Sequence, residues 1–309
     1  MEQALYGPDG FFVHHRPAEH FRTSAHSPLF ALALSRFISK VDSALGNPDP
    51  LEIVDIGAGS GELLTNVLKT LPAALLRRVR PVAVEIPVIR DLYAGHADDT
   101  PRELPDHADL GWRSDIPDGI VGVLLATEWL DNVPLDLAEN GCYLYDGEPV
   151  SAQDAEWISR WWPSPSGIVE IGRSRDEAWA SAVGKLRAGV ALTVDYGHLA
   201  STRPSLPTVT GFRDGREVEP LLDGSTDITC HVAMDSVAAA AGIRYTLKRQ
   251  REALQELGVS GARPPLELAH KDPVGYVRAL AEASEAATLT DPDGLGGHWW
   301  LWHELGCAI

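Results

Sequence analysis

The stretch EIVDIGAGSGELL, residues 52–64, decides the fold of this chain. An apolar run from Ile53 to Ile56 leads into three glycines at alternate positions, Gly57, Gly59 and Gly61. A helical pattern of apolar residues follows at once and ends at Pro72. A strand, a glycine turn and a helix in this order bring a ligand close to bare backbone at the N-terminus of a helix.

The residues around the glycines exclude two common ligands. A dinucleotide fingerprint has its third glycine three positions after the second, but Glu62 stands there. A phosphate loop ends in Gly-Lys-Ser/Thr, which this stretch lacks. Asp55 and Glu62 on either side would also repel a pyrophosphate, so the loop is predicted to face a cationic or neutral ligand.

The composition argues against several partners. The chain has 309 residues, enough for one elaborated α/β domain or two small ones, and its net charge is −18. That charge disfavours binding to nucleic acid and to anionic membranes, and it either suits a cationic partner or serves solubility alone. Three dispersed cysteines (Cys142, Cys230, Cys307) and the lack of a signal or spanning segment predict a soluble cytoplasmic protein with reduced thiols.

The remaining pattern predicts a parallel sheet covered on both faces. Ser27-Pro28 is typical of a helix start, and near-continuous apolar runs occur at residues 79–86, 119–131 and 189–198. Helical patterns separate these runs, as in an α/β fold. Because no repeat or low-complexity linker interrupts the chain, residues 1–309 are predicted to form a single domain.

An insertion is expected between two of these strands. Asn140-Gly141 lies between short apolar segments and predicts a β-hairpin. Residues 151–175 contain Trp157, Trp161 and Trp162 and are interpreted as an irregular aromatic segment, either the core of the insertion or a stacking platform. A helix, a strand, a further helix and a terminal strand at residues 297–306 are expected towards the C-terminus.

Acidic residues stand where the predicted strands end, and ligands of open parallel sheets bind outside those ends. The positions concerned are Asp55, Glu85, Glu128, Asp131 and Asp195. Glu85 follows Asp55 by about 30 residues, the length of one strand–helix–strand unit. A carboxylate there can accept both hydroxyls of a ribose, although an ordinary charged strand end looks the same in sequence.

The glycine loop after Asp55, with an acid ending the next strand, resembles the S-adenosylmethionine loop of class I methyltransferases. Five ordered motifs are more specific, and together they resemble the MidA family, which includes a mitochondrial methyltransferase needed for respiratory complex I assembly. These motifs are YGPDGFF (6–12), HFRTSAHSPLFALALSRFI (20–38), ATEWLDNVP (126–134), VDYGH (194–198) and DITCHVAMD (227–235). The resemblance extends from about Tyr6 to the terminal strand.

The resemblance implies a Rossmann-like fold with a seven-stranded, mostly parallel sheet, helices on both faces, an N-terminal helical lid and a small β/aromatic insertion. The lid and first helix would occupy residues 1–49, and the cofactor-binding core residues 50–134 and 186–200. The insertion would occupy residues 135–185. Residues 201–309 would form a substrate-side segment and the C-terminal strands of the sheet.

The cofactor implied by the resemblance is S-adenosylmethionine. The residues expected to bind it are Thr23, Asp55, Gly57, Ala58, Gly59, Gly61, Glu85, Ile86 and Glu128. Thr23 belongs to the stretch 21–24, which is expected either to form a flap over the cofactor or to pack on the first helix.

The methyl acceptor is less constrained. The mitochondrial relative is an arginine methyltransferase, so a protein arginine is the first candidate, and Glu128 and Asp131 could orient its guanidinium. Alternatively, Asp131 caps the following turn and Glu128 holds the cofactor. His231 is a candidate base, because a histidine exchanges protons near neutral pH.

One departure from the family's pattern widens the range of possible methyl acceptors. Thr127 replaces the amide that precedes the acid of the strand-four motif, which leaves room for a small-molecule N- or O-methyltransferase. A non-catalytic assembly factor that retains the cofactor fold is a third possibility. No metal site is expected, and a homodimer is left open.

Overall fold

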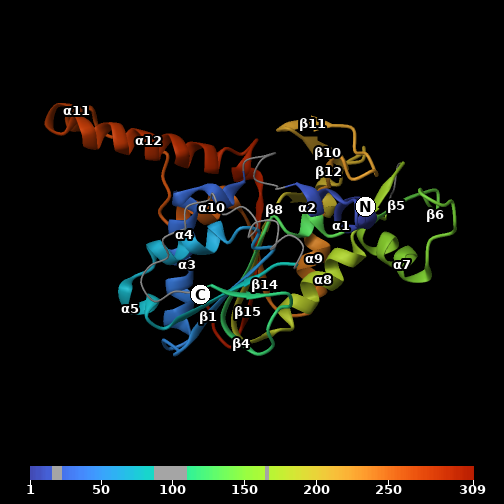
Figure 1. Cartoon of the computed structure of the whole chain (residues 1–309), viewed down its shortest axis with the longest axis horizontal. Coiled ribbons are helices and arrows are strands. Elements are labelled where there is room, and N and C mark those ends of the chain that lie inside the picture. The colour runs from blue at the N-terminus through green and yellow to red at the C-terminus, as the bar shows by residue number, and fades with distance from the viewer. Residues whose placement is uncertain (16–22, 87–109, 164–166) are drawn as a thin grey trace.

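The computed structural model describes residues 1–15, 23–86, 110–163 and 167–309, and its centre is a seven-stranded sheet (Figure 1). The strand order is β14-β15-β8-β4-β1-β2-β3. The bounds are β1 Leu51–Ile56, β2 Val79–Val84, β3 Gly111–Arg113, β4 Ile120–Thr127, β8 Leu186–Asp195, β14 Tyr245–Arg249 and β15 Trp299–Leu305. All neighbours pair in parallel except β15, which is antiparallel to β8 and β14. The predicted mostly parallel, seven-stranded sheet is confirmed.

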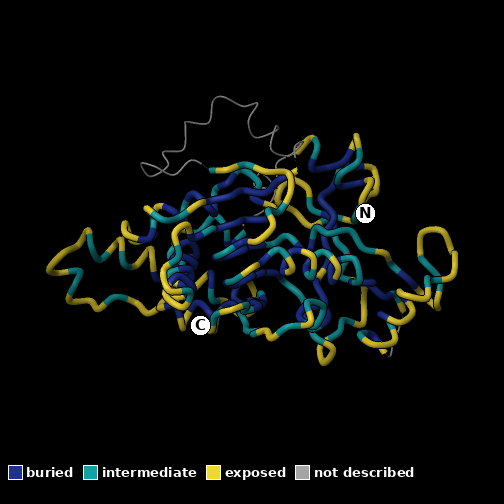
Figure 2. Tube along the Cα trace, turned by 90° about the horizontal axis from the view of Figure 1, so that it is seen from below, coloured by how far each residue is buried: buried dark blue, intermediate teal, exposed yellow. Residues whose placement is uncertain are grey.

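Helices cover both faces of this sheet. Val123 and Leu125 of β4 pack in the core beneath α3 (Pro28–Ala44) and α4 (Glu62–Thr70). Leu124 and Ala126 lie in the opposite core, against α8 (Arg173–Val183) and α9 (Met234–Ala240). Because successive side chains of a strand point to opposite faces, a strand buried on both sides needs the continuous apolar run seen in the sequence. Figure 2 shows buried residues concentrated in the interior of the molecule and exposed ones at its periphery.

The start of α3 is as predicted. Pro28 is its first residue, and the Ser27 hydroxyl accepts a hydrogen bond from the Phe30 amide at 3.3 Å. This side chain satisfies one of the amides that a helix start leaves unpaired.

The insertion confirms one prediction and corrects another. Asn140 and Gly141 have φ of 52° and 81° and join β5 (Asp136–Glu139) to β6 (Cys142–Tyr143) as a hairpin, with β7 (Val169–Ile171) on the other edge. The expectation of an irregular segment over 151–175 was wrong, because α7 (Ala152–Trp161) and the start of α8 occupy much of it. Ser151 caps α7 by accepting from the Asp154 amide, and Trp157 fills the core of the insertion.

The N-terminus folds over the carboxyl ends of the strands. Helices α1 (Glu2–Tyr6) and α2 (Phe11–His14) and the 3₁₀ turn η2 (Ser24–His26) precede α3. The first two pack against Ile228 of β12 (Asp227–Thr229). Strand β12 pairs with β10 (Thr210–Arg213), which pairs on its other side with β11 (Arg216–Val218).

The C-terminal region carries an extended helical arm. Helix α10 (Gln250–Glu256) packs on the body, and α11 (Leu266–Lys271) and α12 (Pro273–Thr290) project away from it (Figure 1). Among the described residues, no helix has both the length and the apolar character needed to span a membrane.

Candidate functional site

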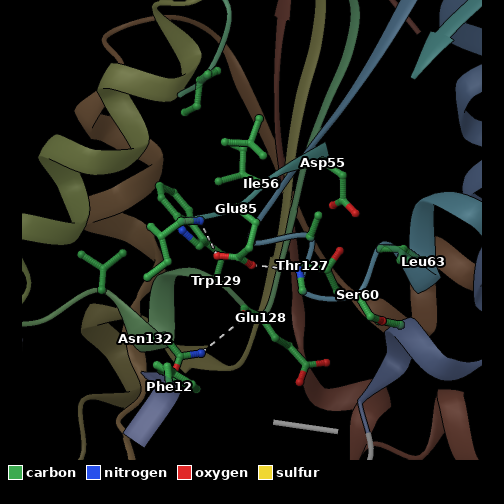
Figure 3. A pocket seen from close by; sticks show the side chains of 18 of the residues that line it. Phe12, Asp55, Ile56, Ser60, Leu63, Glu85, Thr127, Glu128, Trp129 and Asn132 are labelled. Carbon is green, nitrogen blue, oxygen red and sulfur yellow. Dashed lines mark hydrogen bonds between the residues drawn. The ribbon is translucent and has the colours of Figure 1, made fainter. Parts of the chain in front are cut away.

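A cavity of about 960 Å³ opens at the carboxyl ends of β1, β2 and β4 (Figure 3). Strand β1 pairs with β2 on one side and β4 on the other, so the chain order reverses at β1. Open α/β sheets bind their ligands at such a switch point. The carboxylates of Asp55, Glu85 and Glu128 project from these three strand ends into the same region.

The glycine loop after β1 needs its glycines for backbone conformation. Gly57, Gly59 and Gly61 have φ of 67°, 54° and 73°, in the left-handed region that favours glycine. A Cβ on Gly57 would lie 3.0 Å from Cδ1 of Trp129. Gly57, Ala58 and Gly59 line the cavity. Gly61 is not among the residues that line it, and it is the N-cap of α4, beside Leu110. The loop therefore presents backbone, with almost no side-chain bulk, to the cavity.

Glu85 and the loop are joined by hydrogen bonds. One Glu85 carboxylate oxygen accepts from the Gly59 amide at 2.9 Å, and the other accepts from the Ile86 amide at 2.8 Å. Burial raises the pKa of Glu85, and burial together with the charge of Glu85 raises the pKa of Asp55 to about 7. A cation in this cavity would favour the charged form of both acids.

Glu128 has the most unusual backbone of the site. Its φ of 51° is rare for a residue with a side chain, and outliers of this kind gather at functional sites. The Ser24 amide donates to its carboxylate at 3.2 Å, which ties the N-terminal segment to the end of β4. Burial, with a smaller contribution from Asp131, raises the pKa of Glu128 to about 8.

Asp131 is buried and is not one of the residues that line the cavity. Its carboxylate accepts hydrogen bonds from the Tyr196 hydroxyl at 2.5 Å and the Thr229 hydroxyl at 2.8 Å. The turn after β4 is capped by Asp195 and not by Asp131. One carboxylate oxygen of Asp195 accepts from the Leu130 amide at 3.0 Å and from the Asp131 amide at 3.3 Å. The structure thus separates the two acids of the strand-four motif, with Glu128 in the cavity and Asp131 behind its wall.

Arg175 supports the same wall, and the sequence did not single it out. This arginine is 1% exposed, and its guanidinium donates to four backbone carbonyls. The acceptors are Asp131 at 2.5 Å, Val133 at 3.0 Å, Cys230 at 3.0 Å and His231 at 3.1 Å. Arg175 therefore connects the loop after β4 to the segment that follows β12.

His231 lies outside the cavity lining and is exposed. Its ring centroid is 5.3 Å from that of Tyr196, and its backbone amide donates to the Thr208 hydroxyl. Partial burial lowers the pKa of its imidazole. His231 is thus outside the cavity and contacts Tyr196, whose hydroxyl donates to Asp131.

The N-terminal segment supplies a second wall of the cavity. Tyr6, Phe12 and Thr23 line it, and the Tyr6 hydroxyl donates to the Asn132 carbonyl at 3.1 Å. Burial, and then the nearby acids, raise the pKa of Tyr6, which keeps it a neutral donor. Thr23 is therefore at the cavity as expected, whereas Phe21 and Arg22 of the expected flap lie outside the described residues.

The segment that follows β3 also lines the cavity, and it was not predicted from the sequence. Ser114, Asp115 and Ile116 follow β3 and line the cavity together with Ile86 and Glu85. The two isoleucines offer apolar surface next to polar groups, a combination suited to a planar heterocycle with exocyclic hydrogen-bonding groups.

The described lining is strongly acidic. Its acidic members are Glu2, Asp55, Glu62, Glu85, Asp115 and Glu128. His26 and Lys185 are its basic members, and Lys185 already pairs with Asp118 at 2.7 Å. The described residues contain no group of three or more His, Cys, Asp or Glu side chains placed to hold a metal ion. The cavity is therefore electrostatically suited to cationic ligands.

Comparison with known proteins gives one family and a fold. The profile of a family described as "Putative S-adenosyl-L-methionine-dependent methyltransferase" matches residues 33–161 and 150–252. A crystal structure of a Burkholderia thailandensis protein bound to S-adenosyl-homocysteine gives a TM-score of 0.75 at 20% identity, over 100% of this chain and 87% of that chain. A native structure of a protein from the same organism and superfamily gives 0.74 at 20% identity, over 100% and 86%. No curated protein matches the chain.

Proposed function

The chain belongs to the family of S-adenosyl-L-methionine-dependent methyltransferases and has their class I fold, and on that premise we propose that it methylates a cationic protein side chain. The observation that carries the choice of acceptor is the carboxylate of Glu128, held in a strained backbone at the edge of an acidic cavity. Arginine is the first candidate, since the five motifs resemble the MidA family.

The proposed cofactor site uses the glycine loop and the acids beside it. Glu85 would accept the ribose hydroxyls, since each of its oxygens retains a free lone pair after accepting one amide. Asp55 would face the amino end of the cofactor, and Ile86 and Ile116 would enclose the adenine ring. S-adenosylmethionine supplies the methyl group as part of a sulfonium cation, which suits an acidic cavity.

The proposed acceptor site lies between the end of β4 and the N-terminal wall. Methyl transfer forms a bond from the acceptor nitrogen to carbon, breaks the carbon–sulfur bond and leaves a proton to be removed from the nitrogen. Ionised Glu128 would orient the cationic acceptor and take that proton, while Tyr6 and Phe12 exclude water. Asp131 would act only through the loop it anchors.

Glu85→Ala provides the first test. We expect the affinity for S-adenosylmethionine to fall about 10- to 100-fold, because hydrogen bonds to a charged group contribute about 1.5–3 kcal/mol and the Gly59 amide also loses its acceptor. Calorimetric titration measures the change. Glu148→Ala, an exposed acid in the insertion, is the control and should bind as the wild type does. Unchanged affinity in Glu85→Ala would remove Glu85 from the site.

The pH dependence of cofactor binding tests the acids. Because the pKa of Glu128 is near 8 and that of Asp55 near 7, both carboxyls are at least half protonated at pH 7. A bound cation stabilises the charged forms and lowers both pKa values, so affinity should rise with pH up to about pH 8, the pKa of Glu128 without the cation, with release of protons. Calorimetry in buffers of different ionisation enthalpy counts those protons. Glu128→Gln should release up to about one proton fewer at pH 7, and equal release in both proteins would contradict the assignment.

A small-molecule acceptor is the second candidate, because the aromatic rings of Tyr6 and Phe12 line the cavity beside its polar groups. Incubation with S-adenosylmethionine carrying a labelled methyl group distinguishes the two. Label transferred to arginine peptides, and lost in Gly59→Arg, supports the proposal. Label found only in a small-molecule extract favours the second candidate. Binding of the cofactor without any transfer would favour a non-catalytic assembly factor.

A further inference from the structure

Two acceptor atoms, one in the loop after β4 and one in β12, are buried without a hydrogen-bond partner among the residues that the structure describes. They are Oδ1 of Asn132 and Oδ1 of Asp227. The orientation of the Asn132 amide follows from its partners, because its Nδ2 donates to Oδ1 of Asp131 at 2.9 Å and to the Glu128 carbonyl at 3.4 Å (Figure 3). Buried polar atoms are nearly always paired, so each exception calls for an explanation.

Asp227 faces the acid that also contacts Asn132. Successive residues of a strand point to opposite sides, so Asp227 and Thr229 share one side of β12, while Ile228 packs against α1 and α2 on the other. The Thr229 hydroxyl donates to Asp131 at 2.8 Å. Asp227 is 1% exposed, and burial, followed by the charge of Asp131, raises its pKa to about 8. A buried carboxyl with an unpaired oxygen lowers stability, and such groups gather at functional sites.

Tyr6 lies near both unpaired atoms and belongs to the cavity lining. Its hydroxyl donates to the Asn132 backbone carbonyl at 3.1 Å. Burial raises the pKa of Tyr6, and the charges of Asp131 and Asp227 add to this effect, so both acids are close to its ring. Tyr6 is the last residue of α1, a helix of 5 residues with no side-chain hydrogen bond at its N-cap. A short, weakly held element of this kind can open locally at low cost.

The unpaired atoms select the chemistry of a ligand. Both are acceptors, and they belong to two different elements, so one ligand can satisfy them only if it carries several N–H donors. A guanidinium presents five donors in a planar fork, whereas an ammonium presents three on a single atom. The positive charge of either group would favour the ionised form of Asp227. The number and separation of the acceptors favour the guanidinium.

We propose that Asp227 and the amide oxygen of Asn132 bind the guanidinium of the methyl acceptor, and that Tyr6 closes this subsite until the acceptor displaces its hydroxyl from the Asn132 carbonyl. The inference rests on the proposed function and deepens it, because it assigns arginine over lysine. The nitrogen that receives the methyl group would face Glu128 and the cofactor, while the other nitrogens contact Asp227 and Asn132. Asp227 is thus assigned as a binding residue and not as the proton acceptor.

Ethylguanidine, which carries the head group of arginine, tests the subsite directly. Calorimetric titration with saturating S-adenosylhomocysteine is expected to detect binding to the wild type at millimolar concentrations, and weaker binding of propylamine, which carries the head group of lysine. Asp227→Asn should lower the affinity for ethylguanidine at least about 10-fold, the effect of losing a hydrogen bond between charged groups. Asp223→Asn makes the same change at an exposed acid before β12 and should bind as the wild type does.

Two further measurements separate binding from structure. Because Oδ1 of Asp227 is buried and unpaired, Asp227→Asn should leave the midpoint of urea unfolding unchanged or raise it, whereas loss of a structural carboxylate would lower it. Tyr6→Phe should bind ethylguanidine about 3- to 10-fold more tightly, because no hydrogen bond to Asn132 then holds the subsite closed.

The proposal is overturned if the wild type fails to bind ethylguanidine, or if Asp227→Asn binds it equally well. Lost binding together with a lower unfolding midpoint in Asp227→Asn would make Asp227 a structural residue. Equal affinities for ethylguanidine and propylamine would contradict the choice of a guanidinium. Methyl transfer to arginine peptides with binding insensitive to Asp227 would reject this subsite alone. Binding that depends on Asp227, without transfer to any arginine peptide, would reject the proposed function instead.

Discussion

Gly59→Arg is expected to fold and to lose binding of S-adenosylmethionine by at least about 100-fold, equivalent to about 2.7 kcal/mol. Gly59 has φ of 54°, lines the cavity and donates its amide to Glu85 at 2.9 Å. A side chain in this backbone conformation costs roughly 1–2 kcal/mol, and the loop would relax away from Glu85 to relieve it. The guanidinium would also occupy the cavity and repel the sulfonium cation.

Gly147 provides a matched control that separates the effect on the cofactor site from the effect of backbone strain. Gly147 has φ of 73°, and a Cβ there would meet nothing within 4 Å. Gly147→Arg carries the same backbone penalty in a turn of the insertion, so it should lower stability slightly and leave cofactor affinity unchanged. Calorimetric titration of both variants, with circular dichroism to establish folding, completes the test. Equal affinities in Gly59→Arg and the wild type would place the cofactor elsewhere.

The parts of the site that follow from local sequence were predictable. The glycine loop, Glu85 and Glu128 sit directly at strand ends, and an apolar run that stops at a glycine or an acid marks such an end without knowledge of the rest of the fold. The hairpin at Asn140-Gly141 was predictable for the same reason, because both residues favour the left-handed conformation that the turn requires.

The parts that depend on contacts between distant segments were not predictable from these patterns. The Tyr6 hydroxyl donates to the carbonyl of Asn132, which lies 126 positions away in the sequence, and no local pattern predicts that hydrogen bond. His231 was predicted to be a base from the chemistry of its side chain, and the structure places it outside the residues that line the cavity. The helix α7 was missed although Ser151 and Asp154 form a recognisable start, because the tryptophans and prolines around it dominated the interpretation.

The contacts of Arg175 join distant segments and are not predicted by local sequence patterns. Replacing this arginine is expected to have the largest effect on stability. In Arg175→Met, four backbone carbonyls lose a donor, and the charge that offsets Asp131 and Asp195 disappears. Breaking a buried charged network of this kind costs about 3–5 kcal/mol, a large part of the roughly 5–15 kcal/mol that stabilises a domain. Urea unfolding measures this loss as a lower midpoint.

Arg175→Lys tests whether the geometry of the guanidinium matters beyond its charge. Lysine keeps the charge, but its single ammonium group cannot reach carbonyls on both sides of the planar fork. We expect intermediate stability and a cofactor affinity lowered several-fold, because Glu128 and Trp129 lie in the loop that Arg175 holds. Arg173→Met, in the same helix, removes a partly exposed arginine that pairs with Asp154 at 2.6 Å. Its cost should be smaller, about 1–3 kcal/mol, because buried Asp154 keeps hydrogen bonds from Tyr143 and Ser151, and cofactor affinity should be unchanged. If Arg175→Lys matched the wild type in both stability and affinity, the loop would be held by Asp195 and Tyr196 alone.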